Sequence, residues 1–246
     1  MDSNIILSVN KLDLSFKQNK IYDYKLIKDL SFSLKRNSIS SFLTPSGAGK
    51  STLFNLIAEN KNKCVEFTGK KLFYIPQIPI SLPWLNPFDN INFLNQNISK
   101  GTIETSLKEV GLEGYEKHLP HNKSLGFRFR IILAAALSFN SDLILIDDTF
   151  LQMDIKTKHE LFDLLFKIRD KKNITFLYGT SNFNDALLFS EILFVTKDNP
   201  LELLLTEYLP NLPTKISQKL NDKLFLDFKL KIVNDIELYN LFNVVL

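Results

Sequence analysis

The segment Thr-Pro-Ser-Gly-Ala-Gly-Lys-Ser-Thr, residues 44–52, has the composition of a loop that binds phosphate. Such a loop needs backbone N–H groups directed at the anion, a helix N-terminus behind them and a cation for the outer phosphates. Gly47 and Gly49 let the backbone approach a ligand closely. Lys50 supplies the cation, and the Ser51 hydroxyl is suited to holding Mg²⁺. The predicted nucleotide contacts are Pro45, Ser46, Gly47, Ala48, Gly49, Lys50, Ser51 and Thr52.

Two adjacent carboxylates form the second chemical feature. Asp147 and Asp148 follow the apolar run from Leu143 to Ile146, which is typical of a strand buried on both faces. A carboxylate at the carboxyl end of such a strand, beside a phosphate loop, is suited to supporting Mg²⁺. We therefore assign Asp147 to the metal and expect Asp148 to orient or deprotonate water; a solvated strand end is the plainer alternative.

The segments around these residues predict the strand–loop–helix order that a phosphate loop requires. Residues 38–44 are strand-like, and after the loop Leu53, Leu56 and Ile57 recur at helical spacing. Strands and helices then alternate: helices are predicted at 124–137, 155–170 and 183–189, and strands at 143–146, 173–179 and 191–196. This alternation predicts an α/β fold with a mostly parallel sheet.

The remaining segments are predicted from shorter patterns. Strand-like runs occur at 5–16, 25–34, 64–67 and 71–75. Residues 77–100 contain three prolines and the only tryptophan, which favours a loop with short helical pieces. Residues 102–119 are predicted as a helix, and residues 200–246 as a smaller α+β appendage.

The composition excludes several classes of protein. The chain has 246 residues, of which 45% are hydrophobic and 23% charged, as in soluble globular proteins. Its net charge of +3 comes from 30 basic and 27 acidic residues, too balanced for a nucleic-acid-binding protein. The lone Cys64 excludes an intrachain disulfide and a cysteine zinc cluster. The first residues do not resemble a signal peptide, and no apolar run approaches the ~20 residues of a transmembrane helix.

Together these motifs resemble the ATP-hydrolysing subunits of ATP-binding-cassette (ABC) transporters, over about residues 5–196. The phosphate loop matches the family's Walker A loop, and Asp147 its Walker B aspartate. Gln77 resembles the Q-loop glutamine, which would contact the metal and the reacting phosphate. Asp154 falls on the D-loop aspartate, and Phe16 takes the place of the aromatic residue that stacks on adenine.

The resemblance also identifies a signature motif, Lys-Ser-Leu-Gly-Phe at 123–127, where the family has Leu-Ser-Gly-Gly-Gln. The matching residues, Ser124 and Gly126, would contact the γ-phosphate of the ATP held by another subunit. Leu125 and Phe127 replace a glycine and the glutamine, and Lys123 stands in place of the leucine, so the motif departs from the family pattern at three positions.

Three further residues depart from the family pattern. Thr44 replaces the first Walker A glycine, Asp148 stands one methylene short of the catalytic glutamate, and Ser181 replaces the switch histidine. Phosphoryl transfer depends on positioning and charge stabilisation, and a displacement of ~1 Å can cost about a hundredfold in rate. We therefore expect good Mg-ATP binding with slow hydrolysis, and take Asp148, Ser181 and Gln77 as the catalytic candidates.

Within the family, Leu-Pro-Trp-Leu at 82–85 is similar to the segment after the Q-loop in nitrate, sulfonate and taurine importers. Trp84 in this loop is either an anchor for a partner or packed into its own domain. The resemblance implies a P-loop NTPase core at 1–76 and 139–196, with an N-terminal antiparallel β subdomain. It adds a helical signature subdomain at 77–138 and a C-terminal α+β extension at 197–246.

The resemblance further implies how the chain would work. Two ATP-binding subunits, identical or different, would enclose two nucleotides between them and dock through residues 77–138 onto transmembrane permease subunits. A solute-binding protein would take part indirectly, and the chain would lie in the cytoplasm on the inner face of the cell membrane. Two alternatives remain open: a degenerate ATP-binding module beside a competent sister subunit, and a P-loop kinase or non-transport ATPase.

Overall fold

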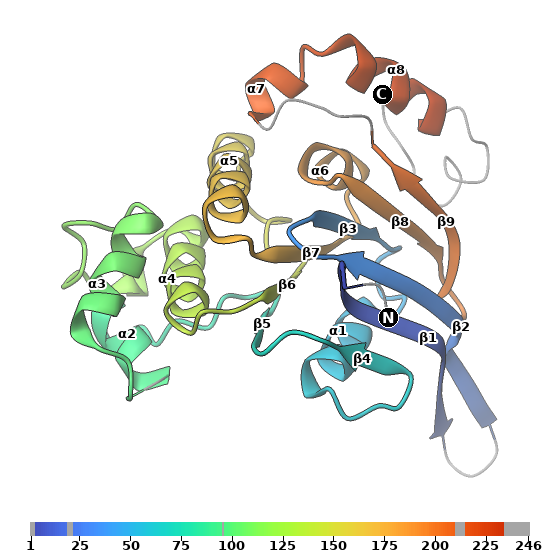
Figure 1. Ribbon diagram of the computed structural model, residues 1–246, viewed down its shortest axis with the longest axis horizontal. Coiled ribbons are helices and arrows are strands. Elements are labelled where there is room, and N and C mark those ends of the chain that lie inside the picture. The colour runs from blue at the N-terminus through green and yellow to red at the C-terminus, as the bar shows by residue number, and fades with distance from the viewer. Residues whose placement is uncertain (1–2, 19–21, 95, 210–214, 234–246) are drawn as a thin grey trace.

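In the part of the chain that the structure describes, the central element is a six-stranded sheet with the order β5-β6-β7-β3-β8-β9 (Figure 1). This computed structural model describes residues 3–18, 22–94, 96–209 and 215–233. The first five strands in that order are parallel, and β9 lies antiparallel at the edge. The strands are β3 (Ile39–Leu43), β5 (Leu72–Ile75), β6 (Leu143–Asp147), β7 (Thr175–Thr180), β8 (Ile192–Lys197) and β9 (Glu202–Tyr208). The predicted α/β fold with a mostly parallel sheet is confirmed.

A second, antiparallel sheet lies against one face of the first. Within the described ranges it has the order β2-β1-β4, built from β1 (Ile5–Gln18), β2 (Tyr22–Lys35) and β4 (Val65–Phe67). The backbone N–H of Lys28 on β2 donates to the carbonyl of Leu201, which ties this sheet to the segment between β8 and β9. This arrangement confirms the antiparallel N-terminal part that the resemblance implied.

Helices cover both faces of the central sheet. They are α1 (Lys50–Glu59), α2 (Pro87–Leu94), α3 (Lys100–Glu109), α4 (Leu125–Ser138), α5 (Ile155–Lys172), α6 (Phe183–Phe189), α7 (Ile216–Lys219) and α8 (Lys223–Val233). In Figure 1, α2, α3 and α4 group at the left, while α5 and α6 lie above the sheet. Of the helices in the described residues, none has the length and apolar character that crossing a membrane requires.

The helix predicted at 102–119 was wrong in its second half. The α3 helix ends at Glu109, and residues 110–119 form turns. Gly111 and Gly114 have φ values of 75° and 84°, in the left-handed region that terminates helices. The predicted C-terminal extension contains β9, α7 and α8, while its residues 210–214 and 234–246 lie outside the described residues.

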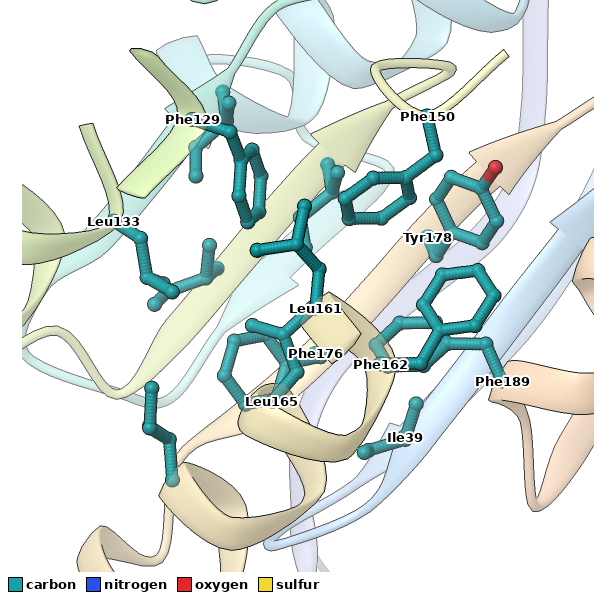
Figure 2. Close-up of a cluster of buried hydrophobic side chains, with 14 of the residues drawn as sticks. Ile39, Phe129, Leu133, Phe150, Leu161, Phe162, Leu165, Phe176, Tyr178 and Phe189 are labelled. Carbon is teal, nitrogen blue, oxygen red and sulfur yellow. The ribbon is translucent and has the colours of Figure 1, made fainter. Parts of the chain in front are cut away.

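The apolar run of β6 is buried on both faces, which explains why its pattern does not alternate with polar residues. Leu143 and Leu145 join the core formed with α1 and the N-terminal sheet. Ile144 and Ile146 point the other way, into the core beneath α5 and α6. Figure 2 shows this second core, in which Phe162 stacks on Phe189 with ring centroids 4.7 Å apart. The two cores together hold the ends of β3, β6 and β7 in a fixed relation.

Candidate nucleotide-binding site

The candidate site lies where the carboxyl ends of β3, β6 and β7 meet. These strands are neighbours in the sheet and run parallel, so the segments that follow them emerge at one edge. The loop at 44–49 follows β3, Asp147 and Asp148 lie at the end of β6, and Thr180 and Ser181 lie at the end of β7. The topology therefore brings together segments about 100 and 130 residues apart in the sequence.

The backbone of the loop requires its two glycines. Gly47 and Gly49 have φ values of 81° and 100°, in the left-handed region where side chains are strained. A Cβ atom at Gly49 would also lie 2.9 Å from the Leu26 side chain on β2. The loop ends where Lys50 begins α1, so the helix N-terminus faces any anion bound there.

Thr44 does not disturb this loop, although it replaces a glycine of the family pattern. Its φ is not in the left-handed region, so no glycine is needed for conformational reasons. The side chain is fully buried, and its hydroxyl oxygen accepts a hydrogen bond from Thr196 Oγ1 on β8 at 3.1 Å. The replacement is therefore accommodated within the sheet.

Lys50 is almost fully buried, with 8% of its surface exposed, and its ammonium group lies between the two carboxylates. Its Nζ atom is 3.1 Å from Asp148 Oδ2 and 3.8 Å from Asp147 Oδ1. Gly179 on β7 makes room for this side chain, because a Cβ there would lie 2.6 Å from Lys50 Cδ and 2.7 Å from Phe54 Cζ. Sequence analysis missed Gly179; the available signal was a glycine inside a buried strand, which often marks a close approach.

Asp148 is held by several donors. Its Oδ1 accepts from Thr180 Oγ1 at 3.2 Å, and its Oδ2 accepts from Ser181 Oγ at 3.5 Å in addition to Lys50. Its backbone N–H donates to the carbonyl of Gly179 at 2.7 Å, and its φ of 48° is a left-handed value that aspartate tolerates better than most residues. The structure therefore brings Asp148 and Ser181, both proposed for catalysis, into direct contact.

Among the described residues, one carboxylate oxygen of Asp147 accepts a hydrogen bond, and the other does not. Its Oδ2 accepts a hydrogen bond from the Tyr74 hydroxyl at 3.0 Å. Its Oδ1 is buried and has no hydrogen bond in the described part of the chain. Burial and then the negative charge of Asp147 raise the pKa of Tyr74, while a hydrogen bond from Asn55 opposes the rise, so the phenol remains a donor.

This geometry fits Mg²⁺. A buried carboxylate oxygen without a hydrogen bond is costly unless a cation or donor satisfies it, and carboxylate and hydroxyl oxygens are the ligands that Mg²⁺ prefers. The second predicted ligand, Ser51, is exposed at the start of α1. Asp147 Oδ1 and the Ser51 hydroxyl are therefore the side-chain oxygens suited to the metal.

Gln77 and Phe16 lie at the border of the site. Gln77 is exposed, two residues beyond β5, and Thr149 Oγ1 donates to the carbonyl of Pro76 at 3.1 Å, which ties the start of this loop to the end of β6. Phe16 is half-exposed on β1, opposite Tyr24 on β2. Among the described residues, no hydrogen bond joins Gln77 to Lys50 or to either aspartate.

The signature and D-loop residues form a second group. Ser124 caps α4 by accepting from Phe127 N at 3.3 Å, and Asp154 caps α5 by accepting from Thr157 N at 2.9 Å. The Thr157 side chain also lowers the pKa of Asp154 by hydrogen bonding. A Cβ at Gly126 would lie 2.6 Å from Thr157 Cγ2, so the two caps are adjacent. In the described ranges, no hydrogen bond or ion pair connects this group to the phosphate loop.

Comparison with known proteins identifies the family. A family model described as "ABC transporter" matches residues 27–151, about half of the chain. The aliphatic sulfonates import ATP-binding protein SsuB 2 of Pseudomonas syringae is 30% identical over 77% of this chain and 83% of its own length. The formylaminopyrimidine import ATP-binding protein ThiZ of Halalkalibacterium halodurans is 32% identical over 72% of this chain and 75% of its own.

Solved structures show the same fold. CbiO1 of Clostridium perfringens, part of an ABC transporter complex, superposes with a TM-score of 0.74 over 96% of this chain and 97% of its own, at 18% identity. A dimeric ATP-binding cassette in a post-hydrolysis state, bound to ADP and Pi, has a TM-score of 0.71 at 23% identity and covers 84% of this chain and 100% of its own. The chain therefore belongs to the ABC transporter family and has the fold of its ATP-binding cassettes.

Proposed function

We propose that the chain is the ATP-binding subunit of an ABC-type importer, which binds Mg-ATP and hydrolyses it slowly while partner membrane subunits move the solute. The relatives named as import ATP-binding proteins support the importer role. The main support for the nucleotide site is the arrangement around Lys50, which is a buried cation beside a glycine loop and two carboxylates. The P-loop kinase alternative is set aside because the chain belongs to the ABC transporter family.

In this mechanism the chain's own groups bind and orient the nucleotide. The loop N–H groups and Lys50 take the phosphates, which requires Lys50 to leave its contact with Asp148. Asp147 Oδ1 and the Ser51 hydroxyl would hold the metal, and Gln77, in the loop after β5, would be a further ligand. When bound, Mg²⁺ neutralises the charge that develops on the phosphates.

The surroundings of Asp148 support slow hydrolysis. A carboxylate that orients or deprotonates water needs an oxygen directed at that water. Here the side chain is short, and both oxygens already accept hydrogen bonds, from Thr180 and Ser181. Ser181 also lacks the reach of an imidazole toward the reacting phosphate. Binding and release of the nucleotide would still bias two conformations of the assembly.

Large exposed apolar side chains support docking onto a membrane partner. They lie between the Q-loop and the end of α2: Ile78, Ile80, Trp84, Phe93 and Leu94. Trp84 is 68% exposed, so in the free chain it is not packed into its own domain. An exposed apolar patch anchored by tryptophan is typical of a protein interface. We assign this patch to the permease subunits, which would hold the chain at the inner face of the membrane.

The signature and D-loop residues are assigned to a second ATP-binding subunit. Ser124, Gly126 and Asp154 lie at the adjacent N-termini of α4 and α5, whose N–H groups suit an anion. Because they do not join the chain's own phosphate loop, a nucleotide on a second subunit is the partner we propose for them. The second subunit is either a copy of this chain or a different ATP-binding subunit; both are compatible with the proposal. A solute-binding protein would act upstream of the permease.

The test compares nucleotide binding with turnover. Calorimetry should detect Mg-ATP binding that Lys50→Ala abolishes, and steady-state assays with the membrane partners should give turnover well below the roughly 1–10³ per second of typical enzymes. The double variant Asp148→Glu with Ser181→His should still bind Mg-ATP and should raise turnover. Absence of Mg-ATP binding would refute the proposal, and turnover in the usual range would refute slow hydrolysis.

A further inference from the structure

Tyr74 connects the strand before the Q-loop to the carboxylate proposed for the metal. We propose that Tyr74 is a positioning residue for Asp147: its hydroxyl holds Oδ2 and thereby leaves Oδ1 free to bind Mg²⁺. The inference rests on the proposed nucleotide site and adds to it a residue that none of the family motifs above accounts for.

The sheet fixes the position of Tyr74. In the parallel pairing of β5 with β6, Tyr74 lies opposite Leu145, two residues before Asp147. Its ring is partly buried and packs against the core formed by α1 and the N-terminal sheet. A ring packed in this way has little rotational freedom, so the hydroxyl reaches Asp147 Oδ2 at 3.0 Å from a defined direction.

The two oxygens of Asp147 are in different states. Oδ2 has the Tyr74 hydrogen bond, whereas Oδ1 is buried without one, in the described part of the chain, and has only the Lys50 ammonium group at 3.8 Å. Rotation of the carboxylate would break the one hydrogen bond it has. The Tyr74 hydrogen bond therefore keeps Asp147 Oδ1 at the edge of the sheet where the phosphate loop and the first turn of α1 lie.

Lys50 does not perform this orienting function. Its Nζ atom lies closer to Asp148, at 3.1 Å, and a bound phosphate would draw it away from the carboxylates. Tyr74 has no such competing role and can hold Asp147 both before and after a nucleotide binds. Outer hydrogen-bond partners of metal ligands often matter in this way, and their loss costs about 10- to 100-fold in metal affinity.

The experiment separates metal binding from nucleotide binding. In Tyr74→Phe, calorimetry with a non-hydrolysable ATP analogue in excess EDTA should give the wild-type affinity. A Mg²⁺ titration of the same binding should show a half-saturating concentration raised by about 10- to 100-fold. Tyr208→Phe is the matched control, since it removes a tyrosine hydroxyl from β9 at the opposite edge of the same sheet.

Each result decides a separate question. Asp147→Asn should raise the Mg²⁺ requirement at least as much as Tyr74→Phe. An unchanged Mg²⁺ requirement in Tyr74→Phe would overturn the inference. So would an equal loss of affinity with and without metal, or a drop in ligand-free thermal stability that accounts for that loss, since either indicates a purely structural role. If the wild-type chain binds no nucleotide, the proposed function fails instead.

Discussion

Lys50 has a carboxylate partner within its own chain. The contact with Asp148 Oδ2 at 3.1 Å lies in a buried site, where water screens it weakly. A nucleotide must replace this contact with one to its own phosphates, and the Asp148 charge repels those phosphates. In the proposed mechanism, Asp148 would therefore oppose nucleotide binding as well as serve hydrolysis.

We therefore predict that Asp148→Asn binds ADP more tightly than the wild type. The expected gain is up to about tenfold, the equivalent of 1.4 kcal/mol, measured by calorimetry so that hydrolysis plays no part. Asp227→Asn makes the same charge change on an exposed position of α8 and should leave the affinity unchanged. Equal or weaker ADP binding by Asp148→Asn would show that the ion pair does not compete with the nucleotide.

Gly179 provides a second residue-scale prediction, because the space for Lys50 depends on its missing side chain. In Gly179→Ala the new Cβ would contact Lys50 Cδ and the buried ring of Phe54. We expect a loss of about 1–3 kcal/mol in the free energy of unfolding and weaker Mg-ATP binding, measured by urea unfolding and calorimetry.

The matched control for this substitution is Gly101→Ala. A Cβ at Gly101 meets nothing within 4 Å, and the residue lies in α3, where alanine is the better helix former by about 1 kcal/mol. That variant should keep its nucleotide affinity and be as stable as the wild type or more so. Similar losses in both variants would contradict the role given to Gly179.

At the scale of elements, Lys219 attaches α7 to the end of α6. Its Nζ atom donates to the carbonyls of Leu188 at 2.9 Å and Ser190 at 3.2 Å, and the side chain is almost fully buried. Burial lowers the pKa of Lys219 to about 7, although the negative charge of Glu191 opposes the shift. A cation at the carboxyl end of a helix is favourable, but removing it from water has a cost.

The pH dependence follows from this shift. Between the folded pKa of about 7 and the unfolded value of 10.5, the unfolded chain binds more protons, so this residue makes stability rise with pH. Below pH 7 Lys219 is protonated in both the folded and the unfolded chain, so the full cost of burying its charge lowers stability. The free energy of unfolding of the wild type minus that of Lys219→Met should therefore increase by roughly 2 kcal/mol between pH 7.5 and 9.5. If urea unfolding gave the same pH dependence of the free energy of unfolding for the wild type and Lys219→Met, the lowered pKa of Lys219 would be refuted.

How much of the site could be predicted from the sequence depended on whether a feature lies within one element or between several. The loop at 44–52 and the end of the run at 143–146 were recognisable because each needs only local pattern. The contacts of Tyr74 with Asp147 and of Gly179 with Lys50 depend on the pairing of β5, β6 and β7, which spacing along one chain does not specify. The end of α3 was missed because helical periodicity outweighed two glycines that end the helix.

At the scale of the whole molecule, the candidate nucleotide site and the exposed apolar patch lie on different parts of the fold. The site is built on strand ends of the central sheet, whereas the patch at 78–94 extends from the loop after β5 to α2. The two are joined through Thr149, which binds the carbonyl of Pro76 beside Gln77 and follows the aspartates on β6. Thr149 therefore ties the start of the loop that bears the patch to the end of β6.

We predict that Trp84→Ala separates these two functions. In the free chain the substitution should leave thermal stability and Mg-ATP affinity unchanged, because the indole is 68% exposed and lies outside the site. Co-purification with the membrane subunits should fall sharply, since an aromatic anchor at an interface is worth about 2 kcal/mol or more, roughly 30-fold in affinity. Leu224→Ala removes a similarly exposed apolar side chain from α8 and should leave association intact. Retained association in Trp84→Ala, or an equal loss in Leu224→Ala, would place the docking surface elsewhere on the molecule.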